Sequence, residues 1–140
     1  PHAQEDIPVA EEVIRLAPGG RNLILRGDFH PRLLRRIYGA MDLFVATRAH
    51  SGIFALTTGT PVLLIAYEVP KGFGIFGPIE GAECVIGIDD VTADKLLTRA
   101  RQILSDRKKM KQIIGEKVAA ATKALRSTVP TLLQAAIQDE

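Results

Sequence analysis

The stretch DLFVATRAHSGIFALTTGTPVLLIA, residues 42–66, contains two short apolar runs separated by a segment with helical character. Leu43–Ala46 and Val62–Ala66 have the length of buried strands, and His50–Thr58 between them predicts a short helix that Gly59 closes. The second run is apolar at every position, which is typical of a parallel strand covered on both faces. A strand, a crossing helix and a second strand form a βαβ unit, so the stretch predicts a parallel sheet.

Strands and helices continue to alternate on either side of this stretch. The further predicted elements are a helix at 6–17, a strand at 22–25, a helix at 31–39, a weak strand at 84–86, a helix at about 92–104, and a last helical stretch from Asp106 that Pro130 restarts. The predicted fold class is therefore α/β, a Rossmann-like parallel sheet with helices on both faces.

The composition narrows the class of protein. A net charge of +2, with two Tyr, five Phe and no Trp, argues against nucleic acid as a partner. Cys84 is the single cysteine, which fits a reducing, cytoplasmic location, and the longest apolar run, Pro61–Tyr67, is too short to span a membrane. The chain opens with Pro1 instead of Met, and a helix precedes the first predicted strand. We therefore expect residues 1–140 to be a single Rossmann-like domain cut from a longer protein.

The segment Thr47-Arg48-Ala49-His50-Ser51 lies between a predicted strand and the start of a predicted helix. Loops at the carboxyl ends of parallel strands hold ligands in open sheets, and a helix N-terminus there attracts anions. Arg48 adds a forked cation suited to phosphate or carboxylate, and His50 can give or take a proton near neutral pH. The alternative is structural: Ser51 caps the helix, and Arg48 and His50 are solvated.

Residues 42–55, DLFVATRAHSGIFA, resemble the signature of the polysaccharide pyruvyl transferases. That signature has an Asp, a short apolar strand, Arg-Leu-His, a small residue and an apolar helix. The resemblance continues through GTPV at 59–62 and YEVPK at 67–71, and more loosely to the strand at 84–87. With Pro1-His2 at its start, it covers most of residues 1–95.

The resemblance implies the C-terminal half of a two-domain enzyme with a GT-B-like architecture, whose N-terminal domain lies outside the sequence. It implies transfer of a pyruvyl group from phosphoenolpyruvate to a sugar or lipid-linked saccharide, forming a ketal in surface or exopolysaccharide biosynthesis. His50 is then the general acid, and Arg48 holds the phosphate or carboxylate with help from Ser51 and the helix N-terminus. The scheme needs no metal and no other cofactor. The chain departs from the family pattern at Ala49, where Leu is commoner, and at Gly77-Pro78, which interrupts a usually longer helix.

Three other residues are candidates for substrate binding. Lys71, past the carboxyl end of a predicted strand, is a candidate phosphate ligand, with an exposed lysine as the alternative. Tyr67 can hydrogen-bond a ligand or pack its ring, and His2 can line the cleft or belong to a ragged terminus. The basic residues at 32–36 and 107–111 are most simply solvated helix faces, with a peripheral membrane contact as the alternative.

Residues 72–77, GFGIFG, match the GxGxxG fingerprint of dinucleotide-binding proteins. Pro78 and Gly81 leave too little helix before the next strand, so the segment predicts a flexible loop beside the ligand site and not an NAD site. Two further functions remain as alternatives. One is the sugar-nucleotide-binding half of a GT-B glycosyltransferase, which the lack of an acidic residue between His50 and Thr58 disfavours. The other is a non-catalytic α/β binding module.

Overall fold

The computed structural model describes the backbone of residues 3–17 and 19–138, and the side chains of residues 6–17, 19–81 and 83–130. His2, a predicted substrate-binding residue, lies outside the described residues. The chain divides into two compact units, residues 1–31 and residues 32–140.

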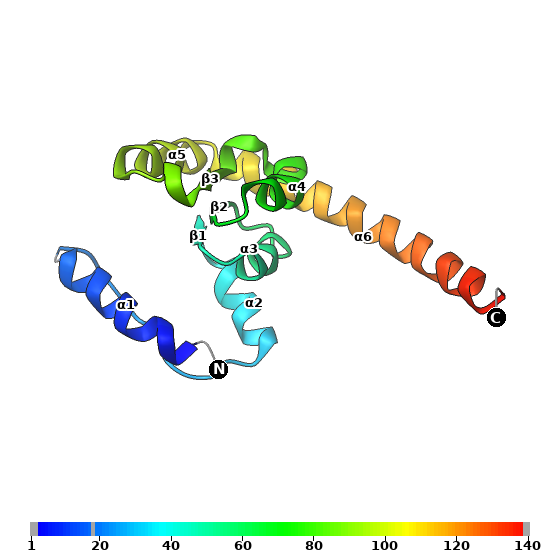
Figure 1. Cartoon of the computed structure of the whole chain (residues 1–140), viewed down its shortest axis with the longest axis horizontal. Helices are drawn as coiled ribbons and strands as arrows, with labels where there is room; N and C mark the ends of the chain where they lie inside the picture. The colour runs from blue at the N-terminus through cyan, green and yellow to red at the C-terminus, as the bar shows by residue number, and fades with distance from the viewer. Residues whose placement is uncertain (1–2, 18, 139–140) are drawn as a thin grey trace. The chain divides into compact units, whose positions relative to one another are not determined.

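The first unit consists of helix α1, Ala3–Leu16, and the irregular segment that follows it (Figure 1). The strand predicted at 22–25 is wrong, because this segment has no regular structure and Leu23 is 81% exposed. A short apolar run becomes a strand only beside a partner strand, and the described residues of this unit offer none. An ion pair between Arg26 and Glu11 joins the segment to α1 instead.

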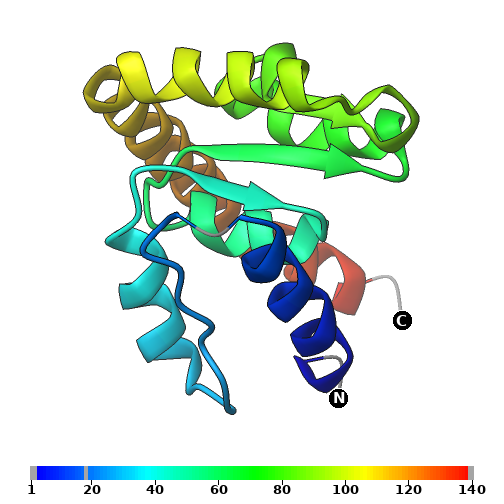
Figure 2. The ribbon, with the colours of Figure 1, turned by 90° about the vertical axis from the view of Figure 1, so that its left-hand side faces the viewer.

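The second unit is built on a parallel sheet with the strand order β1-β2-β3. β1 is Phe44–Ala46, β2 is Val62–Ala66 and β3 is Val85–Gly87. Figure 2 shows the strands of this sheet running in the same direction, and the register places Ala46 opposite Leu64. The predicted parallel sheet is confirmed.

Helices cover both faces of this sheet. They are α2 (Pro31–Gly39), α3 (Ala49–Leu56), α4 (Val69–Glu80), α5 (Ala93–Ser105) and α6 (Arg107–Gln138), with short 3₁₀ helices at Ala82–Cys84 and Ile88–Asp90. Alternate residues of β2 enter different cores: Val62 and Leu64 pack with α3, α4 and α6, whereas Leu63 packs with α5. Figure 2 shows α5 on the opposite side of the sheet from α3. This arrangement confirms the Rossmann-like fold class.

The glycine-rich segment 72–77, predicted as a flexible loop, lies within helix α4. Its buried residues have helical spacing, with Gly72 and Phe76 facing the sheet four positions apart. A Cβ atom on Gly72 would lie 3.1 Å from the Cβ atom of Ala66, so the glycine allows the helix to approach β2 closely. The loop prediction is wrong because this glycine serves packing, not flexibility.

Helix α6 runs without a break through Pro130, where the sequence predicts a restart. Polar contacts join its first turns to the residues just before β1. Lys111 Nζ donates to the carbonyl oxygen of Met41 at 2.8 Å, and Arg107 pairs with Asp42 at 3.3 Å. Two members of the basic run therefore have structural contacts and are not simply solvated. Neither α6 nor any other helix in the described part of the chain is long and apolar enough to cross a membrane.

Replacing Gly52 by alanine should destabilise the protein by about 1–3 kcal/mol, because it overfills a packed core. A Cβ atom here would lie 2.8 Å from Phe76 Cζ and 3.3 Å from Val62 Cγ1. Gly74→Ala is the matched control: a Cβ atom there meets nothing within 4 Å, and alanine favours a helix by about 0.5–1 kcal/mol. Equilibrium urea denaturation measures the stability of both variants. Equal denaturation midpoints for Gly52→Ala and Gly74→Ala would contradict the close packing of α3 against α4.

Candidate active site

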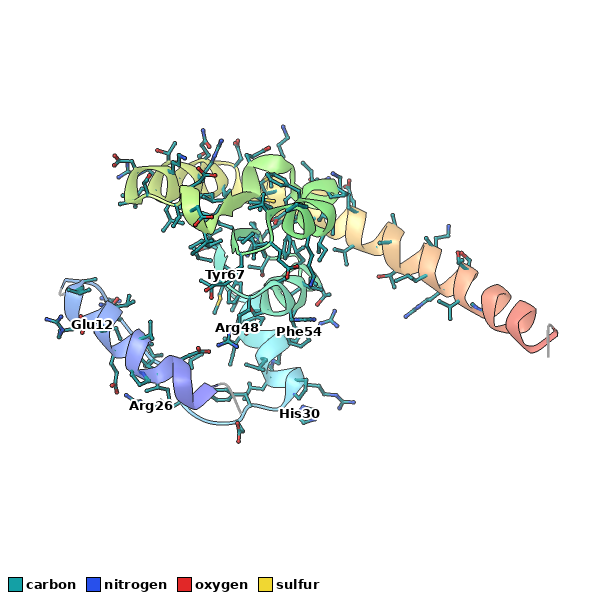
Figure 3. All side chains as sticks on the ribbon, in the orientation of Figure 1. Glu12, Arg26, His30, Arg48, Phe54 and Tyr67 are labelled. Carbon is teal, nitrogen blue, oxygen red and sulfur yellow. The ribbon has the colours of Figure 1, made fainter. Side chains whose placement is uncertain are left out.

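A cavity of about 370 Å³ lies where the carboxyl ends of β1 and β2 meet the N-termini of α3 and α4. Its polar lining comes from the two strand-to-helix connections: Arg48 and His50 from the first, and Tyr67, Glu68 and Lys71 from the second. The other lining residues are Ala49, Ile53, Leu64, Ala66, Gly72 and Ile75. Figure 3 labels Arg48 and Tyr67, one from each connection. Open parallel sheets bind ligands at this edge.

The first connection ends at Arg48, the N-cap residue of α3, whose backbone is extended at φ −117° and ψ 122°. The Arg48 side chain makes no capping hydrogen bond, and Ser51 Oγ donates to the Arg48 carbonyl oxygen at 2.8 Å. The N–H groups of the first turn have no partner within the helix, and the positive end of its dipole lies there as well. This end of α3 is suited to bind an anion.

The second connection ends at Glu68, the N-cap residue of α4, whose side chain also makes no capping hydrogen bond. Pro70 follows in the first turn, where its missing N–H leaves no helix hydrogen bond unmade. Lys71 Nζ lies 3.5 Å from a Glu68 carboxylate oxygen, and these side chains are 63% and 73% exposed. Such an exposed pair contributes at most about 1 kcal/mol, so an arriving anion can displace Glu68 from Lys71.

The charges of the lining favour a small anion with more than one negative charge. Arg48 and Lys71 are two cations, and the N-termini of α3 and α4 add partial positive charge, against the single carboxylate of Glu68. His50 adds an imidazole, a group that can act as a general acid or base. The site can therefore hold an anionic ligand and protonate it.

Four predicted site residues line this one cavity: Arg48, His50, Tyr67 and Lys71. Ser51 is not in the lining, since its hydroxyl bonds back to the preceding turn. Glu68 lines the cavity but was not predicted. Its signals in the sequence are its position two residues after an apolar strand and its place within YEVPK at 67–71.

The GxGxxG match at 72–77 does not form a dinucleotide-binding turn. Such a turn joins the end of a strand to the start of a helix, whereas α4 already begins at Val69. Gly72 packs on the sheet, and a Cβ atom on Gly74 or Gly77 would meet nothing within 4 Å. The fingerprint is therefore part of a packed helix.

The fold and this pocket define an α/β protein that has a positively charged ligand site at the carboxyl ends of its parallel strands. The family model described as polysaccharide pyruvyl transferase matches residues 2–69. This match confirms the resemblance to the polysaccharide pyruvyl transferase family over residues 2–69. The matched segment includes Arg48, His50, Tyr67 and Glu68 and ends just before Lys71. No curated protein and no solved structure matches the chain.

Proposed function

We propose that this pocket binds phosphoenolpyruvate and that the protein transfers its pyruvyl group to two hydroxyls of a saccharide, forming a ketal. The observation that supports this most directly is the shared lining of Arg48, His50 and Lys71, which combines two cations with a proton donor. Phosphoenolpyruvate has a phosphate and a carboxylate a few bonds apart. Two cations and two helix N-termini match that distribution of charge. The family match over residues 2–69 supports the same chemistry.

In the proposed reaction, Arg48 binds one anionic group of phosphoenolpyruvate through its forked guanidinium, and Lys71 binds the other. His50 gives a proton to the methylene carbon, which makes the neighbouring C2 electrophilic. One saccharide oxygen bonds to C2, the bond from C2 to the phosphate oxygen breaks, and the second saccharide oxygen bonds to C2. Two hydroxyl protons are released. One restores His50, and the other leaves with inorganic phosphate.

The wider setting of this reaction is also part of the proposal. Residues 1–140 would form the C-terminal half of a GT-B-like enzyme, and an N-terminal half would supply most contacts to the acceptor. The acceptor would be a sugar or a lipid-linked saccharide in the cytoplasm. Lys108 and Lys109, exposed at the start of α6, could contact the membrane that holds such an acceptor.

Arg48→Ala should lower the affinity for phosphoenolpyruvate by about 10–100-fold. A hydrogen bond between charged groups contributes about 1.5–3 kcal/mol, and the forked contact to an anionic group would be lost. Lys71→Ala should have a smaller effect, because a lysine contributes a single point charge that is already partly compensated by Glu68. Isothermal titration calorimetry of the complete protein with phosphoenolpyruvate measures both effects.

Lys95→Ala is the control for this titration. Lys95 is also exposed and also pairs with a carboxylate, that of Asp90 at 3.9 Å, but it lines a different cavity. The Lys95→Ala variant should bind phosphoenolpyruvate with the same affinity as the wild type. Unchanged affinity in Arg48→Ala would contradict the proposed donor site. Binding of a nucleoside diphosphate without binding of phosphoenolpyruvate would support the sugar-nucleotide alternative instead.

A further inference from the structure

We propose that Glu68 is a further catalytic residue, the base that takes a proton from a saccharide hydroxyl during transfer. This inference rests on the proposed function, because it assigns a role within the same pocket. Among the described residues, Glu68 is the one carboxylate in the lining, and it lies in the same lining as His50 and Lys71. Three observations lead to this assignment: its structural contacts, its charge and the needs of the reaction.

The contacts of Glu68 do not explain why a carboxylate occupies this position. Its side chain makes no capping hydrogen bond to α4. Its backbone carbonyl oxygen accepts from Gly72 N at 3.0 Å, a bond that any residue type can make. Its side chain pairs with Lys71 at 3.5 Å, and the two side chains are 73% and 63% exposed, so solvent screens their attraction. The carboxylate is therefore available to a ligand.

The negative charge of Glu68 favours contact with the acceptor saccharide and not with phosphoenolpyruvate, the pyruvyl donor. A carboxylate beside a site for an anion repels that anion, so Glu68 does not promote binding of phosphoenolpyruvate. An ionised carboxylate accepts hydrogen bonds through both oxygens, and a neutral saccharide presents hydroxyl donors. When an anion binds Lys71, Glu68 loses its ion pair with that lysine. Both of its oxygens are then available for hydroxyls next to the bound donor.

The proposed reaction requires a group that does what Glu68 can do. A hydroxyl oxygen that bonds to C2 must lose its proton, while the methylene carbon gains a proton from His50. Glu68 takes the first hydroxyl proton, which passes through solvent to restore His50. The second hydroxyl proton passes to the departing inorganic phosphate when the second saccharide oxygen bonds to C2. All protons are accounted for, and the reaction involves no net oxidation or reduction.

The test replaces Glu68 by glutamine, which keeps the size of the side chain but cannot take a proton. Phosphoenolpyruvate affinity is measured by calorimetry, and transfer by phosphate release with p-nitrophenyl hexopyranosides of galacto, gluco and manno configuration as acceptors. We expect Glu68→Gln to bind phosphoenolpyruvate as tightly as the wild type or more tightly. We expect its rate of transfer to fall by about 10²–10⁴-fold, the usual contribution of a general base.

Two further variants show whether the effect belongs to a base in this pocket. Glu68→Asp keeps a carboxylate and should retain part of the rate, with the acid limb of the pH–rate profile that Glu68→Gln loses. Asp90→Asn removes an exposed carboxylate that pairs with Lys95 and lies outside this lining, so it should behave as the wild type does.

Several results would overturn the inference. A rate in Glu68→Gln within about threefold of wild type would show that no base is lost. An equal loss of phosphoenolpyruvate affinity and of rate would show that Glu68 only positions Lys71. A wild-type protein that binds no phosphoenolpyruvate and releases no phosphate from it would instead refute the proposed function itself, and this inference with it.

Discussion

His50→Ala is expected to lower the rate of pyruvyl transfer by about 10²–10⁴-fold while phosphoenolpyruvate still binds. His50 is the second residue of α3, and its exposed side chain shares the pocket lining with Arg48 and Lys71. An imidazole in this place can give a proton to a bound donor and regain one from solvent. Alanine removes the proposed proton donor from the lining. It leaves both cations and both helix N-termini in place.

Phosphate release measures the rate, and calorimetry with phosphoenolpyruvate shows whether the donor still binds. His30→Ala is the control, since His30 is exposed and lies outside the pocket lining. In D₂O, the methyl group of the wild-type product should contain one deuterium, because the proton on the exchangeable acid reaches the methylene carbon. Transfer by His50→Ala at the wild-type rate would rule out the proposed general acid. So would a product methyl group without deuterium.

The sheet could be predicted because its strands are apolar wherever helices cover them. β2, buried along almost its whole length, begins and ends at the predicted residues 62 and 66. Three of the four residues at 22–25 are also apolar, but the segment forms no strand, since strand formation depends on a partner that the run itself does not reveal. In α4 the opposite happened. Pro78 and Gly81 indicated a loop, yet Phe76 is fully buried and the helix packs tightly on the sheet.

The candidate site could be predicted in part, because Arg48 and His50 belong to one motif on one connection. Tyr67 and Lys71 come from the next connection. The four residues line one cavity because β1 and β2 are parallel neighbours, with Ala46 opposite Leu64. Glu68 escaped prediction for a physical reason. A charged residue at a helix start ordinarily lies in solvent, and only the cavity shows that Glu68 shares its lining with the other four residues.

A second acidic residue, Glu80 at the end of α4, shows a burial that the sequence did not reveal. It is only 7% exposed, and its Oε1 atom accepts a hydrogen bond from Val62 N at 2.8 Å, at the start of β2. Its Oε2 atom is buried without a hydrogen-bond partner. Burial raises the pKa of this carboxyl from its ordinary value of 4.5 to about 8, and the hydrogen bond from Val62 offsets only part of this rise. Glu80 is therefore protonated in the folded protein at neutral pH.

The wild type should lose stability as the pH rises, and Glu80→Gln should not show this loss. In the unfolded chain the carboxyl ionises near pH 4.5, whereas in the folded protein it holds its proton until about pH 8. Between these values the folded state binds more protons, so the free energy of unfolding falls with rising pH, by up to about 5 kcal/mol across the window. Glutamine has no proton to lose, and its amide oxygen can still accept from Val62 N.

Urea denaturation between pH 4 and pH 9 compares the two proteins, with Glu116→Gln, an exposed carboxylate on α6, as the control. The neighbouring thiol of Cys84 does not obscure the result. Burial, and then the charges of Glu80 and Glu83, raise its pKa to about 12, above the window. Parallel pH profiles for wild type and Glu80→Gln would contradict the burial of a protonated acid. A difference that grows only above pH 8 would also contradict it, because the penalty is complete once both states are ionised.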